Sequence, residues 1–237
     1  MRSDKISFIS TVDGLESIEE CLPKPAKHFV PKWFKDIPAF SEQVPTIRHC
    51  PSFPDYFSQG YILPMWTDSK LSYDKNTSMW FWDTSSKQFD FSTHDSKQFL
   101  NHTKASFNGV EGQFVFKANC PWRVITPPGW SILQLPLFYH FNQEWSVMPG
   151  VIDTDIHSEI HQQILYHGND NKEVKINRGD PLVLYIPYKR KDSLDLEIRA
   201  ANEKDKKIIN RQGLNIGTKY VTGGVYRQLQ RQRDKNK

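Results

Sequence analysis

The chain has 237 residues, of which 24% are charged and 13% aromatic, and its formal net charge is +4. The aromatic content excludes a disordered chain, and the small net charge, much of it in residues 227–237, excludes a broad nucleic-acid-binding face. Residues 6–11 are β-prone and begin the predicted elements. Residues 31–38 read Pro-Lys-Trp-Phe-Lys-Asp-Ile-Pro, and prolines at both ends predict a short helix with one apolar face.

Cysteine usage and hydropathy suggest where the protein works. Cys21, Cys50 and Cys120 are far apart and form no CxxC pair, which argues against a cysteine-based zinc site and suits a reducing compartment. No window approaches the ~20 apolar residues of a membrane span, and the first ten residues lack a signal-peptide core. We therefore expect a soluble protein without membrane partners, located in the cytoplasm of a host cell or in a virion. The frayed basic tail is the only part expected to touch nucleic acid.

Most of the middle of the chain has the pattern of short β-strands. Aromatic and β-branched residues with period-two alternation, separated by turn residues, are typical of half-buried strands. They predict strands at residues 60–66, 78–83, 87–92, 114–117, 122–126, 131–135, 159–166, 174–176 and 182–187.

The pattern changes after Arg190. Asp192 or Ser193 can cap a helix that would run over Leu194, Leu196, Ile198, Ile208 and Ile209, with Gly213 as its stop and a loop from Gly213 to Gly224. The sequence thus predicts three parts: a proline-rich arm with a short helix (1–45), a β-rich core (46–190) and a C-terminal helix with a basic tail (191–237).

Residues 124–190 hold the most informative motifs. In chain order they are Thr-Pro-Pro-Gly-Trp ending at Trp130, then Gly-Val-Ile-Asp-Thr-Asp over 150–155, then Asn-Arg-Gly-Asp-Pro ending at Pro181. Each is a turn beside apolar residues, and an acidic turn between strands is a common position for a base or a ligand contact. Gly129, Trp130, Gly179 and Asp180 are therefore candidate ligand-binding residues.

In order and spacing these motifs resemble those of the trimeric dUTPases and their β-clip relatives. The resemblance implies a mainly β fold with a β-clip, dUTPase-like barrel core over residues 113–190, an N-terminal extension and a C-terminal helix. It places Asp153 where that family keeps the carboxylate that deprotonates the attacking water, and Asp155 at the second acid of the motif.

The departures from the dUTPase pattern fall on the phosphate and sugar contacts. The family's Arg-Ser pair is Leu137-Phe138 here, its tyrosine is Ile156, and its glutamine is Leu184. A phosphate site needs hydrogen-bond donors, so the resemblance favours the fold and argues against dUTP hydrolysis.

A second resemblance covers most of the chain. Its motifs are Pro-Lys-Trp-Phe at 31–34, Gly-Tyr-Ile-Leu-Pro-Met-Trp at 60–66, Pro-Trp-Arg-Val-Ile-Thr-Pro-Pro-Gly at 121–129 and Ile-Pro-Tyr-Lys-Arg at 186–190. Together they resemble an uncharacterised family of tailed-phage proteins. The resemblance implies a phage protein without an assigned activity.

Two alternatives stay open at the acidic turn and beyond it. Asp153 and Asp155 either form a site or only fix the turn through backbone hydrogen bonds. His157, Glu159 and His161 share one face if they form a strand, which suits either a divalent metal or the polar face of an edge strand, although positions i, i+2 and i+4 span about 13 Å.

The leading hypothesis is a non-enzymatic, phage-type protein that acts through contacts with itself or with other phage proteins, as an oligomeric virion or assembly component, without a cofactor. The alternative is a divergent nucleotide- or metal-dependent enzyme or binder that uses the Asp153 turn, with a divalent metal as cofactor.

Overall fold

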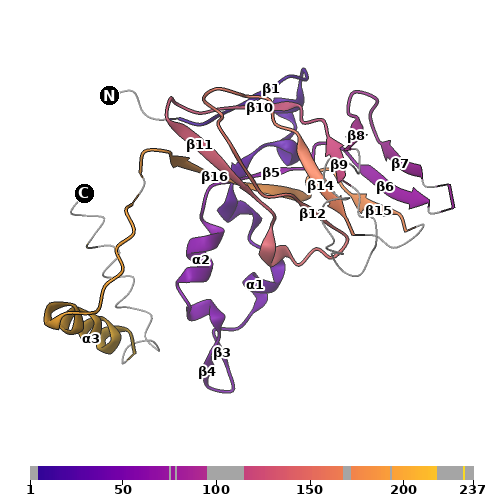
Figure 1. Ribbon diagram of the computed structural model, residues 1–237. Helices are drawn as coiled ribbons and strands as arrows, with labels where there is room; N and C mark the ends of the chain where they lie inside the picture. Colours follow the sequence, from indigo (N-terminus) through magenta and orange to yellow (C-terminus); the bar gives the residue numbers. More distant parts are fainter. Residues whose placement is uncertain are drawn as a thin grey trace. The chain divides into compact units, whose positions relative to one another are not determined.

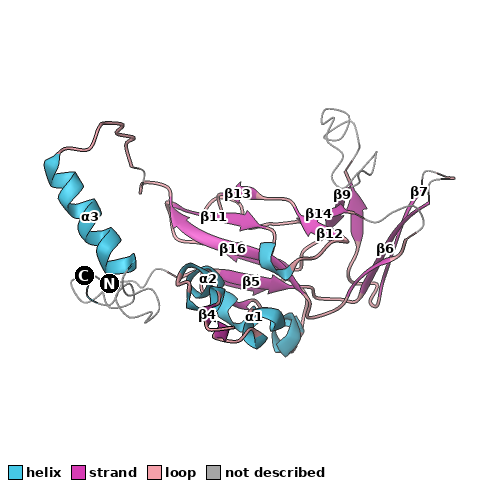
Figure 2. Ribbon diagram, turned by 90° about the horizontal axis from the view of Figure 1, so that it is seen from below, coloured by secondary structure: helices cyan, strands magenta, loops and turns pink. Residues whose placement is uncertain are grey.

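The computed structural model describes residues 5–74, 76–77, 79–94, 115–167, 172–192, 194–217 and Gln232. The chain, whose helices and strands are labelled in Figure 1 and in Figure 2, divides into two compact units. The first comprises the residues up to Phe29 together with Gly60–Asp192, and the second comprises Val30–Gln59 and the residues from Ser193 onward. This division differs from the sequence-based boundaries at residues 45 and 190.

The first unit is built from antiparallel sheets, which confirms the predicted mainly β class. A five-stranded sheet has the order β13 (Gly150–Ile152), β11 (Trp130–Leu135), β16 (Pro181–Lys189), β5 (Tyr61–Pro64) and β2 (Lys24–Pro25). A four-stranded sheet has the order β12 (Trp145–Val147), β14 (Gln162–Tyr166), β9 (Val115–Ala118) and β8 (Phe91–Thr93).

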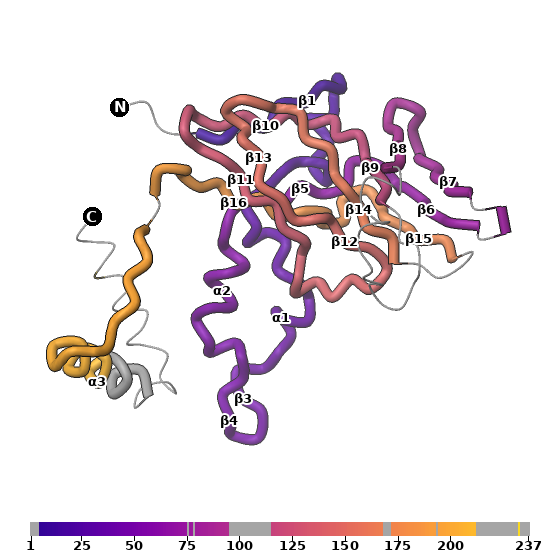
Figure 3. The backbone as a smooth tube through the Cα atoms, in the orientation of Figure 1, coloured from indigo at the N-terminus to yellow at the C-terminus, as the bar shows by residue number. Residues whose placement is uncertain are grey.

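Two smaller sheets complete this unit. One has the order β15 (Val174–Ile176), β6 (Ser69–Asp74) and β7 (Met79–Thr84). The other pairs β1 (Ser7–Ser10) with β10 (Trp122–Ile125), so that strands far apart in the sequence lie side by side (Figure 3). Every pairing between the strands of these four sheets is antiparallel.

The second unit contains the short elements of residues 30–59 and the C-terminal helix. The predicted helix at residues 31–38 is confirmed as α1 (Lys32–Asp36), and Phe34 is its buried residue. A hairpin of β3 (Phe40–Ser41) and β4 (Val44–Pro45) and the helix α2 (Ser52–Phe57) follow. Phe34 packs on Phe57 with ring centroids 4.8 Å apart. Helix α3 spans Glu203–Gly217.

The predicted C-terminal helix is only partly correct. Residues 194–202 form no helix, and α3 begins at Glu203. Asn202 caps it reciprocally: its Oδ1 accepts from the Asp205 backbone N–H at 3.0 Å, and its own N–H donates to the Asp205 carboxylate at 2.9 Å. Gly213 lies inside the helix and does not stop it. Apart from Gln232, the basic tail and the rest of the predicted loop lie outside the described residues.

Several predicted strands are shorter than expected, among them 60–66, which is β5 (Tyr61–Pro64), and 159–166, which is β14 (Gln162–Tyr166). The strand predicted over residues 87–92 is β8, which begins only at Phe91. The Thr84 hydroxyl donates to the carbonyls of Ser86 and Phe89, and the Phe89 N–H donates to the Ser86 carbonyl. These local hydrogen bonds hold residues 85–89 in a turn after β7, which keeps their backbone out of the sheet.

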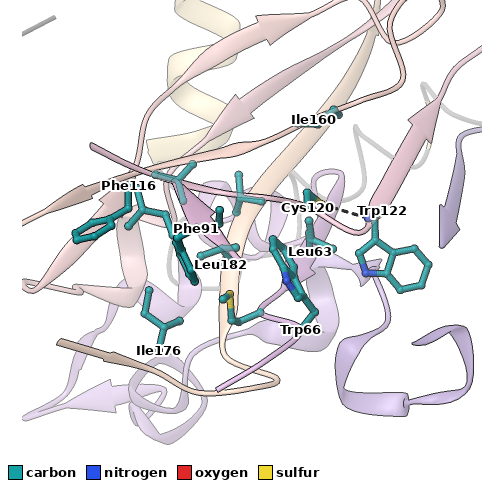
Figure 4. Close-up of a cluster of buried hydrophobic side chains, with 14 of the residues drawn as sticks. Leu63, Trp66, Phe91, Phe116, Cys120, Trp122, Ile160, Ile176 and Leu182 are labelled. Carbon is teal, nitrogen blue, oxygen red and sulfur yellow. Dashed lines mark hydrogen bonds between the residues drawn. The ribbon is translucent and has the colours of Figure 1, made fainter. Parts of the chain in front are cut away.

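The core of the first unit lies among its sheets and is rich in aromatic side chains (Figure 4). Phe116 is fully buried on β9 and meets the rings of Trp80, Trp82, Phe91 and Tyr166 at centroid distances of 5.4–6.4 Å. Edge-to-face contacts of this kind add to the gain from burial. Aromatic residues from the predicted strands at 78–83, 87–92, 114–117 and 159–166 therefore contribute to the core.

Candidate functional site

The acidic turn follows directly from β13. Pairing of β13 with β11 brings residues 150–152 beside residues 132–134, so that the turn lies next to the start of β11. The Asp153 carbonyl accepts from the backbone N–H groups of Ile156 and His157, both at 2.9 Å. Thr154 is buried, and its hydroxyl bonds that of Thr126 at 2.7 Å. The turn is thus fixed by hydrogen bonds of its own backbone and by the buried side chain of Thr154.

Asp155 is the more enclosed of the two acids, with a side chain only 7% exposed. The Gly129 backbone N–H donates to its Oδ2 at 2.7 Å, and the Arg190 guanidinium binds both oxygens, at 2.9 and 2.5 Å. These donors, Arg190 first, lower the pKa of Asp155 to about 2. A general base works best with a pKa near the working pH, so this arrangement makes Asp155 a weak base and a strong structural link.

Asp153 is half-exposed, at 49% of its side chain. The Ser131 hydroxyl donates to its Oδ1 at 2.6 Å, and the Arg190 Nη1 lies 3.3 Å from the same oxygen. One oxygen of the Asp153 carboxylate, Oδ1, is therefore in contact with two donors. These contacts tie Asp153 to the start of β11 and to Arg190.

Arg190 organises the whole site, and sequence reasoning did not select it. Besides the two acids, its Nη1 donates to the Trp130 carbonyl at 3.0 Å and to the Ser131 hydroxyl at 2.9 Å. Its backbone N–H donates to the Gly129 carbonyl at 3.0 Å. We call these residues (Gly129–Ser131, Asp153–Asp155 and Arg190) the Arg190 cluster. In the sequence, the only sign of the role of Arg190 is its position at the end of the motif at 186–190.

The four predicted ligand-binding residues do not gather in one place within the chain. Gly129 and Trp130 lie in the Arg190 cluster, where the Lys189 ammonium stands 5.2 Å from the centre of the Trp130 ring. Gly179 and Asp180 precede β16, whose far end is Lys189. At ~3.3 Å per residue the two ends of this strand are about 26 Å apart.

The Gly179–Asp180 turn has a structural role of its own. Gly179 has a φ of +86° and donates to the Met65 carbonyl at 2.8 Å, while Met65 donates to the Asp180 carbonyl at 2.8 Å. The Asp180 carboxylate accepts from the Asn177 backbone N–H at 2.8 Å. These bonds join the turn to the chain after β5.

Two of the three candidate metal ligands, Glu159 and His161, contact each other, and Glu159 also pairs with Arg123. The Glu159 Oε1 is 3.1 Å from the Arg123 Nη2 and 3.2 Å from the His161 Nε2, and His157 stands at the end of the acidic turn. Burial is the main cause that lowers the pKa of His161. Within the described ranges, no three His, Cys, Asp or Glu residues come together as a metal-binding group.

A pocket of about 730 Å³ lies elsewhere in the first unit, and no sequence motif pointed to it. It is lined by the residues after β11, by β12 and by the start of β16, including His140, Ser146 and His167. The Ser146 Oγ and the His167 Nε2 are 2.8 Å apart. Burial lowers the pKa of His140 and of His167, because it disfavours the charged imidazolium.

Among the described residues, no helix combines the length and apolar character that crossing a bilayer requires.

Comparison with known proteins gives a likeness of fold only. No family model and no curated protein matches the sequence. Similar solved structures include the dUTPase of Staphylococcus bacteriophage 80alpha with dUPNHPP, at 9% identity and a TM-score of 0.39, over 85% of this chain and 90% of that one. A mutant of the same enzyme with dUpNHpp has 9% identity and a TM-score of 0.38, over 85% and 99% of the two chains.

A third similar structure is a mutant dUTPase from phage phi11 of S. aureus, at 11% identity and a TM-score of 0.37, over 84% of this chain and 97% of that one. At such identities the likeness does not extend to activity. The mainly β class is established by the strands of the chain itself, and its function has to be argued from its own residues.

Proposed function

We propose that this chain is a non-enzymatic, phage-type protein that acts through contacts with itself or with other phage proteins, as an assembly component. The observation that carries the proposal is the apolar segment between β16 and α3. The motifs at 31–34, 60–66, 121–129 and 186–190 support the phage-type assignment.

The segment, which we call the linking segment (residues 194–199), alternates apolar and charged residues. Leu194, Leu196 and Ile198 are 95%, 85% and 86% exposed. The residues between and after them are charged, and Arg199 forms an ion pair with Glu197 at 3.3 Å and another with Asp205. Between Leu194 and Ala200 the chain enters no sheet and no helix, and Figure 1 draws it as an open trace leading to α3.

Alternation with a period of two is the pattern of a strand that buries one face. Three large aliphatic side chains exposed in sequence form an apolar surface of the kind that marks a protein contact. An extended peptide with such a pattern binds by adding a strand to a sheet edge, with its apolar side chains in pockets of the partner. The linking segment therefore has the composition of a docking strand.

The contacts of the acidic turn support the same proposal, because they give its two carboxylates structural roles. Its two carboxylates share Arg190, and their oxygens accept hydrogen bonds from Ser131 and Gly129. The alternative function, a nucleotide- or metal-dependent enzyme or binder at Asp153, has one observation in its favour, the half-exposed Asp153 carboxylate. Calorimetry with dNTPs, Mg²⁺, Mn²⁺, Fe²⁺ and Zn²⁺ tests this alternative. If none of them gives a heat of binding, the alternative is refuted.

The Leu194→Ser/Leu196→Ser/Ile198→Ser variant tests the proposed function. We expect the wild-type protein to form concentration-dependent oligomers in sedimentation velocity runs. The triple variant should associate at least about tenfold more weakly, because each side chain would lose the gain from burial. Its melting temperature should not change, since the three side chains are already exposed.

A matched control replaces the alternate residues, Asp195→Ser/Glu197→Ser, and should leave apolar docking nearly intact. Wild-type protein that stays monomeric at every concentration and is absent from purified particles would refute the proposed function.

A further inference from the structure

The pocket of about 730 Å³ in the first unit has the size of a small-molecule site, since such sites measure about 300–1,000 Å³. One wall is the segment between β11 and β12, and the other walls are β12 itself, the residue after β14 and the start of β16. Strand β16 begins at this pocket and ends beside the Arg190 cluster. The pocket is therefore separate from the acidic turn.

The wall that precedes β12 is held in a fixed shape by its own hydrogen bonds. The Asn142 Oδ1 accepts from the Glu144 backbone N–H at 2.9 Å, and the Glu144 carbonyl accepts from the His167 backbone N–H at 2.8 Å. Phe141 has a φ of +51°, a left-handed conformation that residues other than glycine rarely adopt. Residues held in such conformations are common at ligand sites. A wall that is ordered before binding lowers the entropic cost of taking up a ligand.

Two of the side chains that line the pocket are largely exposed aromatic rings. Phe138 is 69% exposed and Phe141 is 58% exposed, and both belong to the wall before β12. Trp145 lines the pocket from β12 and is nearly buried. The face of an aromatic ring carries partial negative charge and attracts the positive edges of C–H groups. The exposed phenylalanines therefore offer surfaces on which a ring rich in C–H groups can pack.

The charged side chains of the pocket are balanced by protein partners. Among the described residues of the wall they are Glu144, Lys175 and Asp180. Glu144 pairs with Lys172 at 2.8 Å, while Glu173 lies between two lysines, 3.5 Å from Lys175 and 3.6 Å from Lys70. Three carboxylates thus stand against three ammonium groups, and the wall offers no net charge to a ligand. Such a wall favours a neutral ligand over a phosphate or another ion.

The other polar groups of the wall are neutral and can both donate and accept hydrogen bonds. Asn142 and Gln143 contribute side-chain amides, and the Ser146 hydroxyl lies 2.8 Å from the His167 Nε2. Burial lowers the pKa of His140 and of His167, which favours the uncharged imidazole. A ligand that matches this wall is itself neutral and carries several groups that both donate and accept. Hydroxyl groups have this property.

We infer that this pocket binds a neutral sugar. The C–H face of a pyranose ring can pack on Phe138 or Phe141, and its hydroxyl groups can bond the amides, the serine hydroxyl and the free lone pairs of the carboxylates. A flat heteroaromatic ligand would leave most of these polar groups without a partner, which costs binding energy. The inference does not rest on the proposed function, since it involves neither the linking segment nor a chemical reaction.

The experiment is saturation-transfer difference NMR of the full chain with four neutral disaccharides: maltose, cellobiose, lactose and N,N′-diacetylchitobiose. We expect at least one of them to bind, and a titration gives its Kd. Phe138→Ser should weaken the binding of that sugar about threefold or more, because the stacking contact is lost. The matched control is Phe81→Ser, which removes a half-exposed phenylalanine of β7 outside the pocket and should leave the Kd unchanged.

Three results would overturn the inference: no binding of any of the four sugars, binding of adenine or choline in place of every sugar, or equal Kd changes in Phe138→Ser and Phe81→Ser. Thermal melting checks that the variants fold. Gln143→Ala changes an exposed residue of the wall and serves as the second pocket variant, with weaker sugar binding expected again. Loss of oligomers in the linking-segment variant would concern the proposed function alone, because the pocket belongs to the first unit.

Discussion

Asp155→Asn should be markedly less stable than the wild-type protein at neutral pH. The asparagine side chain can still accept from the Gly129 N–H, but its amide group cannot neutralise Arg190, which now donates to both Asp155 oxygens. Arg190 would be left without its main counter-charge beside the Trp130 carbonyl and the Ser131 hydroxyl. Urea unfolding at pH 7 measures the effect as a lower midpoint.

The pH dependence of this difference has a defined sign. The pKa of Asp155 in the folded protein is about 2, below its ordinary value of 3.8. A lowered folded-state pKa stabilises the fold fully above the unfolded-state pKa, and this contribution is lost as the pH falls through the folded-state value. The wild type should therefore lose its advantage over Asp155→Asn between about pH 4 and pH 2.

Asp153→Asn is the matched control for this experiment. Asp153 is half-exposed, and it shares one oxygen with Ser131 and Arg190, whereas Asp155 is held by both oxygens. Its substitution should lower the urea midpoint less than Asp155→Asn does. The assignment of Asp155 as the structural acid would be refuted by equal midpoints, or by a difference that does not change between pH 5 and pH 2.

Gly60→Ala should destabilise the fold by about 2–5 kcal/mol, through backbone strain and overpacking. Gly60 has a φ of +64°, and a Cβ built there would lie 2.0 Å from the Tyr185 carbonyl oxygen. That oxygen belongs to β16, the central strand of the five-stranded sheet, and therefore has little freedom to move away. Urea unfolding gives the free-energy difference.

Gly14→Ala separates the two causes. Gly14 has a φ of +81°, but a Cβ there would meet nothing within 4 Å. Its substitution should show only the strain of the left-handed backbone, about 1–2 kcal/mol. Similar losses in the two variants would mean that the contact with Tyr185 does not matter, and that the backbone conformation accounts for the whole effect.

The sequence predicted the strands best where the local pattern and the tertiary packing agree. The strands predicted at 60–66, 122–126, 131–135 and 182–187 appear as β5, β10, β11 and β16. Their β-branched and aromatic residues prefer a pleated, half-buried surface in any case. Short strands such as β12 and β13 were not predicted, because three residues are too few to show a period.

The largest error in the predicted elements is the start of the C-terminal helix, and its cause can be found in the sequence. Leu194, Leu196 and Ile198 were assigned to a helix, yet they are spaced by two, which is the period of a strand. The true start of α3 also had a local signal, since Asn202 and Asp205 form a reciprocal cap three residues apart. The period of two in the linking segment and the cap at Asn202 and Asp205 together distinguish this segment from the helix.

The site was less predictable than the fold, because its key residue acts at long range in the sequence. Arg190 joins Asp155, 35 positions earlier, to Ser131, 59 positions earlier. No spacing rule connects such residues, since their proximity results from the pairing of β11 with β13 and β16. The acidic motif could be recognised in the sequence. The neutralisation of its carboxylates by Arg190 could be seen only in the three-dimensional arrangement.

The central place of β16 has a consequence for biosynthesis. This strand lies between β11 and β5, and it is the last strand of the sheet to leave the ribosome. Until then β5 and β11 each lack a partner that they require, and an unpaired apolar strand is prone to aggregate. At ~5–20 residues per second, the interval between β5 and β16 lasts several seconds or longer. Nascent chains should therefore depend on chaperones during this interval, and slower translation should increase that dependence.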